Sequence, residues 1–388
     1  MTRLHDALTD IAGEAPAVDL ADRAITGDRR RRRTGVALVV VAVVAVVALG
    51  AVAGTGLLPG WRDNVIAATP KDSSPSRGDG ALADLPPRGV GPLSHAYKTF
   101  CHVARGVPED CRNGEWRVVT RDGKTYHVPQ ALGMAGTLNS VPLAITRDGR
   151  MMAYYSREEQ TFKVRDLESG KELTAPVTVA ERRLRPRASL VLSDDGRHLA
   201  FTAYPAGKEP GLLIDMRAGT TTPLPSGWAP TSVADGGDPV TMVSYPPKGK
   251  AWLMPRPGGG SPVTLDETYT RFSALAPDGR SIAALGMEKV KSGGMHMDGT
   301  LAVLDATTGR TSRKVTVRGL PKDTVLLTLG AWLNRTEVTL ATLPSGRIWE
   351  NRQITYAVNV ATGQARMLGV YTGQHPFQLV IPGAGFAG

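Results

Sequence analysis

Aromatic side chains are scarce in this chain of 388 residues, at only 5% of the sequence. Glycine and proline, in contrast, occur 44 and 28 times. A composition poor in aromatics and rich in turn formers argues against long packed helices and favours many short strands joined by turns. With 41% hydrophobic and 21% charged residues, the chain as a whole is not a disordered one. We therefore expect an all-β fold.

Motifs of the common enzyme classes are also missing. The sequence has no Gly-x-Ser-x-Gly elbow, no His-Glu-x-x-His pair, no P-loop and no dinucleotide fingerprint. Each of these patterns places a nucleophile, a metal or a phosphate group, so their absence argues against the corresponding hydrolases, metalloproteases, nucleotidases and dehydrogenases. We expect a protein that is not an enzyme and that needs no cofactor.

Cysteine occurs only twice, as Cys101 and Cys111. In an oxidising compartment we expect these residues to form a disulfide, which would restrain the unfolded chain by ~2–3 kcal/mol. In a reducing compartment they would be two free thiols. A catalytic thiol is not expected, because His102 is only a sequence neighbour of Cys101.

One long uncharged segment interrupts this composition. Residues 35–58 hold 24 positions without a charge, dominated by Val, Ala and Leu. At ~1.5 Å per residue, such a helix spans the ~30 Å hydrocarbon core of a bilayer. Positively charged residues stay on the cytoplasmic side, and five of them directly precede the segment: Arg29, Arg30, Arg31, Arg32 and Arg33. The sequence thus predicts a single-pass protein of the cell membrane, with its N-terminus in the cytoplasm and its C-terminal domain outside.

Two alternatives accompany this membrane segment. It could be a secretory signal cleaved after Ala53, although the 34 residues before it are long for a signal peptide and include six acidic groups. The spacing of Gly50 and Gly54 would also permit close helix approach and a weak homodimer.

The remaining chain divides by composition. Residues 1–34 read as a short cytoplasmic leader, 59–92 as a Pro/Gly/Ser-rich linker, and 93–388 as an extracytoplasmic folded domain. Residues 59–388 hold 39 basic and 30 acidic groups, which supply most of the net charge of +10. These charges are interspersed and not clustered into a basic patch, so we expect no nucleic-acid partner.

A repeated pattern decides the expected fold of the large domain. An apolar strand, an Asp-Gly turn and a second apolar strand recur about every 40–47 residues, followed each time by another hairpin with a glycine. The clearest turns are Asp148-Gly149, Asp195-Gly196 and Asp278-Gly279. Two weaker units cover 231–268 and 324–373, which gives five units.

Both ends of the domain supply the remaining strands. The hairpin at 115–129 lacks an inner strand, and the segment 376–383 is a strand that lacks a hairpin. Pairing them would complete a ring and remove its open sheet edges. The sequence therefore predicts an all-β propeller of six blades, alternatively seven.

The repeat resembles a known class of propeller. Its Asp-Gly-Arg turns and the hairpin sequence Leu304-Asp-Ala-Thr-Thr-Gly309 are similar to the WD-repeat-like units of TolB-type periplasmic proteins and of membrane-anchored actinobacterial propellers. The resemblance covers about residues 115–383 and implies a propeller that binds proteins or ligands. It does not fix a function, because propellers host unrelated activities.

One cluster could hold a metal ion. Met295, His296 and Met297 offer thioether and imidazole groups, which suit Cu(I). Such residues also occur incidentally in a loop between strands, and this second interpretation is the one we favour. We expect no metal site.

These observations favour a membrane-tethered, non-enzymatic module that binds or scaffolds a protein, peptide or cell-wall partner on the propeller face. A propeller-type lyase or hydrolase that uses a metal is one alternative, and a transmembrane sensor that signals through the leader is another.

Overall fold

The structure, a computed structural model, describes eleven segments of the chain. These are residues 82–99, 114–135, 139–185, 187–203, 207–245, 251–254, 261–289, 295–344, 352–372, 379–384 and 386–387. The chain divides into two units, 1–63 and 64–388. Every described residue belongs to the second unit, so the predicted membrane segment and leader lie outside the described part.

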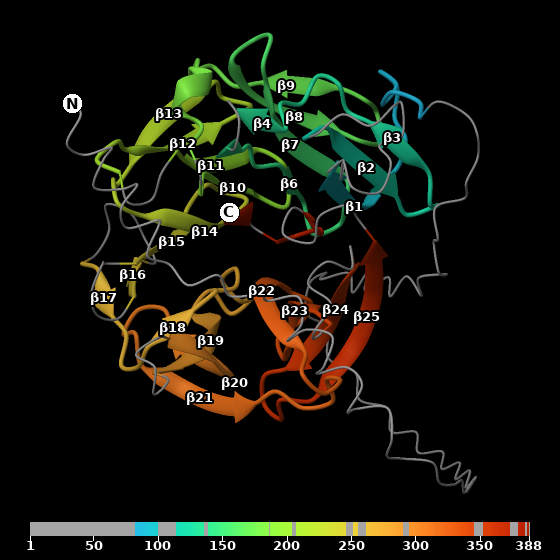
Figure 1. The fold of residues 1–388 in the computed structure, drawn as a ribbon. Coiled ribbons are helices and arrows are strands. Elements are labelled where there is room, and N and C mark those ends of the chain that lie inside the picture. The colour runs from blue at the N-terminus through green and yellow to red at the C-terminus, as the bar shows by residue number, and fades with distance from the viewer. Residues whose placement is uncertain are drawn as a thin grey trace, which may run out of the picture. The chain divides into compact units, whose positions relative to one another are not determined.

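The second unit is a ring of antiparallel sheets (Figure 1). Four blades have four strands, the sheet β1-β2-β3 has three and the sheet β13-β12-β11-β10-β26 has five, and in each blade the strands follow one another outward from the centre. We number the blades by the order in which their hairpins follow one another along the chain. The strands of the first three blades, with a small hairpin between the first and the second, are β1 (Leu93–Lys98), β2 (Trp116–Thr120), β3 (Thr125–His127), β4 (Met134–Ala135), β5 (Asn139–Ser140), β6 (Ala144–Ile145), β7 (Met151–Ser156), β8 (Thr161–Asp166), β9 (Glu172–Thr174), β10 (Ser189–Leu192), β11 (His198–Thr202), β12 (Gly211–Asp215) and β13 (Thr220–Leu224).

Blades four to six follow in the same way and are built from β14 (Ala229–Val233), β15 (Val240–Ser244), β16 (Trp252–Met254), β17 (Val263–Thr264), β18 (Tyr269–Thr270), β19 (Ser281–Lys289), β20 (Met295–Asp305), β21 (Thr311–Thr316), β22 (Val325–Trp332), β23 (Glu337–Leu343), β24 (Arg352–Asn359) and β25 (Ala365–Thr372). A short 3₁₀ turn, η2 (Glu181–Arg183), precedes blade 3, and β26 (Phe386–Ala387) adds to the inner edge of that blade.

Burial explains why these segments form stacked sheets. All five residues of β11 are buried, whereas all three of the outer strand β9 are exposed. An inner strand that is covered on both faces has no polar face, as stacking of one blade on the next requires. The interface between blades 2 and 3 illustrates the packing, since Tyr155, Phe162 and Phe201 form one aromatic cluster there.

The ring closes between the two ends of the domain. Val380 pairs with Ala96 of β1, which in turn pairs with β2. The C-terminal segment therefore supplies the innermost strand position of blade 1, and the prediction of a six-bladed all-β propeller is confirmed. The sequence hairpin at 115–129 is β2 and β3, but β1 lies between it and the closing segment and was not predicted.

The end of the predicted linker also contacts the propeller. Leu85 donates to the His127 carbonyl at 2.7 Å, and His127 donates to the Ala83 carbonyl at 2.9 Å. Further along, the Val90 amide donates to Leu167 of blade 2 at 2.8 Å. Residues 83–90 thus follow the outer strand of blade 1 to a turn of blade 2.

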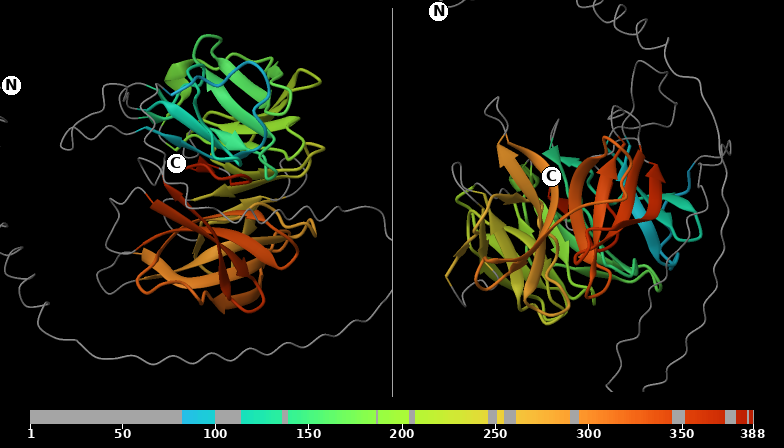
Figure 2. Two further views of the ribbon diagram at one scale, coloured as in Figure 1. Left: turned by 90° about the vertical axis from the view of Figure 1, so that its right-hand side faces the viewer. Right: turned by 90° about the horizontal axis from the view of Figure 1, so that it is seen from below.

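Strand direction gives the ring two different faces. In blades 2 to 6 the turn between the first and second strands and the turn between the third and fourth lie at one end, which we call the turn face. In blade 1 the turn between β2 and β3 lies at this end, where the Arg121 amide donates to the Pro92 carbonyl just before β1. The remaining connections lie at the other end, the loop face. Figure 2 views the strands that run between these two faces. Among the described residues, no helix is long and apolar enough to cross a membrane.

Candidate functional site

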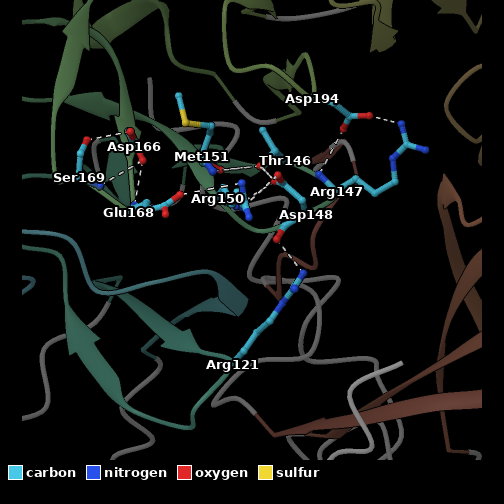
Figure 3. Close-up of polar contacts among 10 residues, drawn as sticks. All are labelled: Arg121, Thr146, Arg147, Asp148, Arg150, Met151, Asp166, Glu168, Ser169 and Asp194. Carbon is cyan, nitrogen blue, oxygen red and sulfur yellow. Dashed lines mark hydrogen bonds and ion pairs between the residues drawn. The ribbon is translucent and has the colours of Figure 1, made fainter. Parts of the chain in front are cut away.

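The Asp-Gly turns of the repeat lie on the turn face, and their carboxylates bond within the turn. The Thr146 hydroxyl donates to Asp148 Oδ1 at 2.7 Å, and the Arg150 amide donates to the same oxygen at 2.9 Å (Figure 3). Asp195 accepts the corresponding bonds from the Ser193 hydroxyl at 2.6 Å and the Arg197 amide at 3.0 Å. These side chains fix the turn geometry.

The Asp278 carboxylate also accepts hydrogen bonds within its own turn, but its hydroxyl donor follows the aspartate in the sequence and does not precede it. It accepts bonds from the Ser281 amide and hydroxyl and from the Arg280 amide. Partial burial opposes ionisation, but the hydrogen bonds from Ser281 and the backbone outweigh it and hold the pKa of Asp278 below its usual range. The carboxylate is therefore an ionised acceptor that its own turn already uses.

The glycines of these turns differ in what surrounds them. Gly149, Gly196 and Gly279 all have a positive φ, which favours glycine. A Cβ on Gly149 would also lie 2.4 Å from the Leu93 carbonyl oxygen, whereas a Cβ on Gly279 would meet nothing within 4 Å. Gly149 thus permits the close approach of blades 1 and 2, whereas Gly279 is required only for the positive φ of its own turn.

Arg147 links three blades across the turn face. Its amide donates to Asp194 Oδ1 at 3.3 Å, and its guanidinium forms an ion pair with the same carboxylate (Figure 3). A further bond of 3.3 Å reaches the Trp332 carbonyl in blade 6. This contact was not predicted, although Arg147 and Asp194 each directly precede the aspartate of a repeat turn.

The Met/His cluster considered as a copper site lies on the extended hairpin of blade 5. His296 pairs across the strands with Glu288, and its Nε2 lies 3.0 Å from Glu288 Oε1. Met297 is opposite Met287 and packs against the core between blades 5 and 6. Since neighbouring strand residues face opposite sides, the side chains of His296 and Met297 leave β20 on opposite faces, although both residues border the hollow described below. Among the described residues, no group of three or more His, Cys, Asp or Glu could hold a metal ion.

Several predicted positions lie outside the described residues. They are the two cysteines, Cys101 and Cys111, the arginines 29–33, the membrane segment 35–58 and the glycine pair Gly50 and Gly54. The disulfide, the orientation, the anchor and the weak dimer stay predictions.

The loop face carries a hollow between blades 5 and 6. Its volume is about 550 Å³, and its wall includes the first residues of β20 and the connection from blade 5 to blade 6. Among the residues that line it are His296, Met297, Arg318, Leu320, Asp323 and Leu326. Apolar and charged groups thus share one concave surface.

Two large aromatic side chains are exposed on the same face. Tyr245 is 51% exposed and Trp252 is 44% exposed, in a chain with few aromatics. Trp252 lies opposite Ser244 in the β15–β16 pair, and Tyr245 directly follows Ser244. The two aromatics therefore flank one loop-face connection of blade 4.

A buried lysine is a third feature of the loop face. Lys98 is fully buried at the end of β1, where its Nζ lies 4.6 Å from the centroid of the Trp116 ring and donates to Ser140 Oγ at 2.5 Å. Burial lowers the pKa of Lys98 to about 7. No sequence pattern indicates this burial, because one lysine at a strand end usually reaches solvent.

The likeness of this chain to known proteins is distant. No protein-family model matches the chain. No curated protein sequence matches it either. Among solved structures, the chain is similar to TolB from Acinetobacter baumannii, with 18% identity over 74% of this chain and a TM-score of 0.45. The match spans 66% of that TolB chain, just under two thirds of its length.

Two further structures are similar to the chain. A putative TolB from Agrobacterium tumefaciens shares 15% identity over 76% of this chain and 97% of its own, with a TM-score of 0.45. The hydrazine synthase of Kuenenia stuttgartiensis shares 14% identity over 62% of this chain and 72% of its own, with a TM-score of 0.39. Two of the three are TolB structures. With TM-scores below 0.5, none of these likenesses carries an argument about fold or function, and the blade number rests on the strand pairing.

Proposed function

We propose that this protein is a membrane-tethered, extracytoplasmic binding module that holds a protein, peptide or cell-wall partner on the loop face of its propeller and catalyses no reaction. The observation that carries the proposal is the pair of exposed aromatics, Tyr245 and Trp252, on the face that also bears the hollow. Tyr and Trp are enriched among the residues that dominate binding energy at protein interfaces.

The residues of the turn face also favour recognition by the loop face. The most regular polar groups of the turn face, Asp148, Asp195 and Asp278, accept hydrogen bonds from within their own turns. Arg147 pairs with Asp194 of blade 3 and donates to the Trp332 carbonyl of blade 6. These groups hold the ring together, which leaves the loop face as the better surface for recognition.

The tether is proposed from the sequence. The uncharged run at 35–58 behind five arginines is typical of a retained anchor with the C-terminal domain outside. A linker of Pro, Gly and Ser would then give the propeller reach from the bilayer.

Loss of binding in a loop-face variant tests this function. The full chain, in mild detergent, is used to capture partners from cell-envelope extract beside a variant with Tyr245→Ser and Trp252→Ser. A matched control carries Met367→Ser, which removes a side chain that is 60% exposed on the outer strand β25 of blade 6. The proposal expects a partner that is captured by the chain and the control and lost from the double variant. Equal capture by all three chains would contradict it.

A further inference from the structure

The last residues of the chain return into the middle of the ring. After Val380 has paired with Ala96, the Gly383 amide donates to the Ile145 carbonyl at 2.9 Å, in blade 2. Ala384 then packs beside Ala341 of blade 6 and donates its amide to the Ile381 carbonyl at 3.1 Å. The segment therefore reverses its direction at the turn face.

The reversed segment forms β26 along the inner edge of blade 3. Phe386 is opposite Leu190 and Ala387 is opposite Ser189, in antiparallel pairing. Figure 1 shows this short red strand beside β10, in the middle of the ring. Since Ser189 begins β10 on the side of the loop face, β26 runs from the turn face toward the loop face.

The pairing covers only part of the available edge. β10 has four residues, all of which pair with β11 on their outer side, whereas β26 pairs with two of them on the inner side. An exposed edge of a sheet recognises any extended chain that offers its own main-chain groups. A segment that spans all of β10 would form a longer ladder than β26 does.

From this arrangement we propose that the inner edge of β10 is a strand-addition site for an extended peptide, and that Phe386–Ala387 occupies it in the resting protein. A peptide entering from the loop face displaces β26 and pairs with Ser189–Leu192. The C-terminal tail, Phe386–Ala387, competes with such a peptide for the edge of β10. Its effective concentration at this edge is high, because the chain just before it is attached to the ring at Val380 and Gly383.

The site is distinct from the exposed aromatics of blade 4. Tyr245 and Trp252 belong to β15, β16 and their connection, while the proposed edge belongs to blade 3. The inference goes beyond the proposed function, and it is tested with a synthetic probe and no native partner. It can therefore fail while the loop-face proposal stands.

The test compares the full chain with a variant that ends at Ala384. This truncation removes β26 but keeps the pairing of Val380 with Ala96 that closes the ring. A second, full-length variant carries Phe386→Pro and Ala387→Pro, which removes two main-chain donors. The probe is a fluorescent peptide with the sequence of residues 381–388, Ile-Pro-Gly-Ala-Gly-Phe-Ala-Gly. A control probe has the same sequence with N-methyl groups on Phe and the last Ala.

Fluorescence anisotropy should show saturable binding of the unmodified probe to both variants and binding at least about tenfold weaker to the full chain, because the tethered tail competes. The N-methylated probe should bind none of them. Circular dichroism and the thermal midpoint of each variant establish that it is folded. Equal binding by all three chains, equal binding of both probes, or no saturation at the roughly millimolar concentrations of a tethered segment would overturn the proposal.

Discussion

Val380 and Ala96 exchange two backbone hydrogen bonds of 2.8 Å, between residues that are 284 positions apart in a chain of 388. The pair joins the C-terminal segment to the first strand of the domain and so closes the ring. Val380 also packs in the cluster between blades 1 and 2, with Trp116 and Tyr154 among its members. This one contact therefore serves both strand pairing and core packing.

Proline at position 380 should weaken the closure. Val380→Pro removes the amide that donates to Ala96, and its pyrrolidine ring clashes with the neighbouring backbone. Together these two effects should lower the free energy of unfolding by about 3 kcal/mol or more. Val380→Ala keeps both hydrogen bonds and should cost only about 1–2 kcal/mol for the smaller side chain. Urea unfolding followed by circular dichroism gives both values. Equal losses for the two variants would show that the hydrogen bonds contribute little.

The glycine turns offer a paired comparison. Gly279→Ala should cost about 1–2 kcal/mol, because alanine is strained at positive φ but meets no neighbour. Gly149→Ala has the same strain and also a contact of 2.4 Å with the Leu93 carbonyl, so it should cost clearly more. Thermal unfolding of the two variants measures the difference. If Gly149→Ala were the milder change, blades 1 and 2 could not approach each other as closely as described.

Much of the fold was predictable because the repeat is local. The Asp148, Asp195 and Asp278 turns recur in sequence, and each encodes a hairpin through contacts that span only a few residues. β1 was not predicted, since Leu93–Lys98 follows a linker and is separated from β2 by a long connection. The bonds of Arg147 to Asp194 and Trp332 were missed for a related reason, because they depend on which blades become neighbours.

The loop-face features were less accessible to sequence analysis. Tyr245 and Trp252 fall within the weak repeat unit at 231–268, but their exposure depends on the neighbouring blade. The burial of Lys98 likewise results from the packing of Trp116 and the small β4–β5 hairpin around it. Such environments arise from tertiary contacts that no single segment encodes.

Lys98 should leave a signature in the pH dependence of stability. Its pKa is lowered by burial from 10.5 to about 7 in the folded chain. Between these two values the unfolded chain binds the extra proton, so the free energy of unfolding should rise with pH across this window. Lys98→Met should remove this part of the rise.

The measurement is urea unfolding at a series of pH values from about 6.5 to 10.5, for the chain and for Lys98→Met. Other groups titrate in both proteins, and the difference between the two curves isolates Lys98. Parallel curves would mean that the Lys98 amine keeps an ordinary pKa.

The predicted anchor can be tested independently of the propeller. The full chain should sediment with membranes and resist extraction by high salt and carbonate, because an apolar helix in the bilayer is not held by charge. Replacing three valines of the run, Val39, Val40 and Val44, by Asp should release it, since each charge is costly in the bilayer centre. A cleaved signal would instead leave a shorter protein in the medium that begins near Gly54.

The most direct test of the account maps the partner on the propeller surface. A photo-reactive amino acid is placed at the partly exposed Ser244, which lies opposite Trp252 on the loop face, and, in a separate chain, at the exposed Ala218 in a turn of blade 3 on the turn face. The account predicts that illumination of cells crosslinks a partner to position 244 and not to position 218. A partner crosslinked only at position 218, or none at either position, would contradict recognition by the loop face.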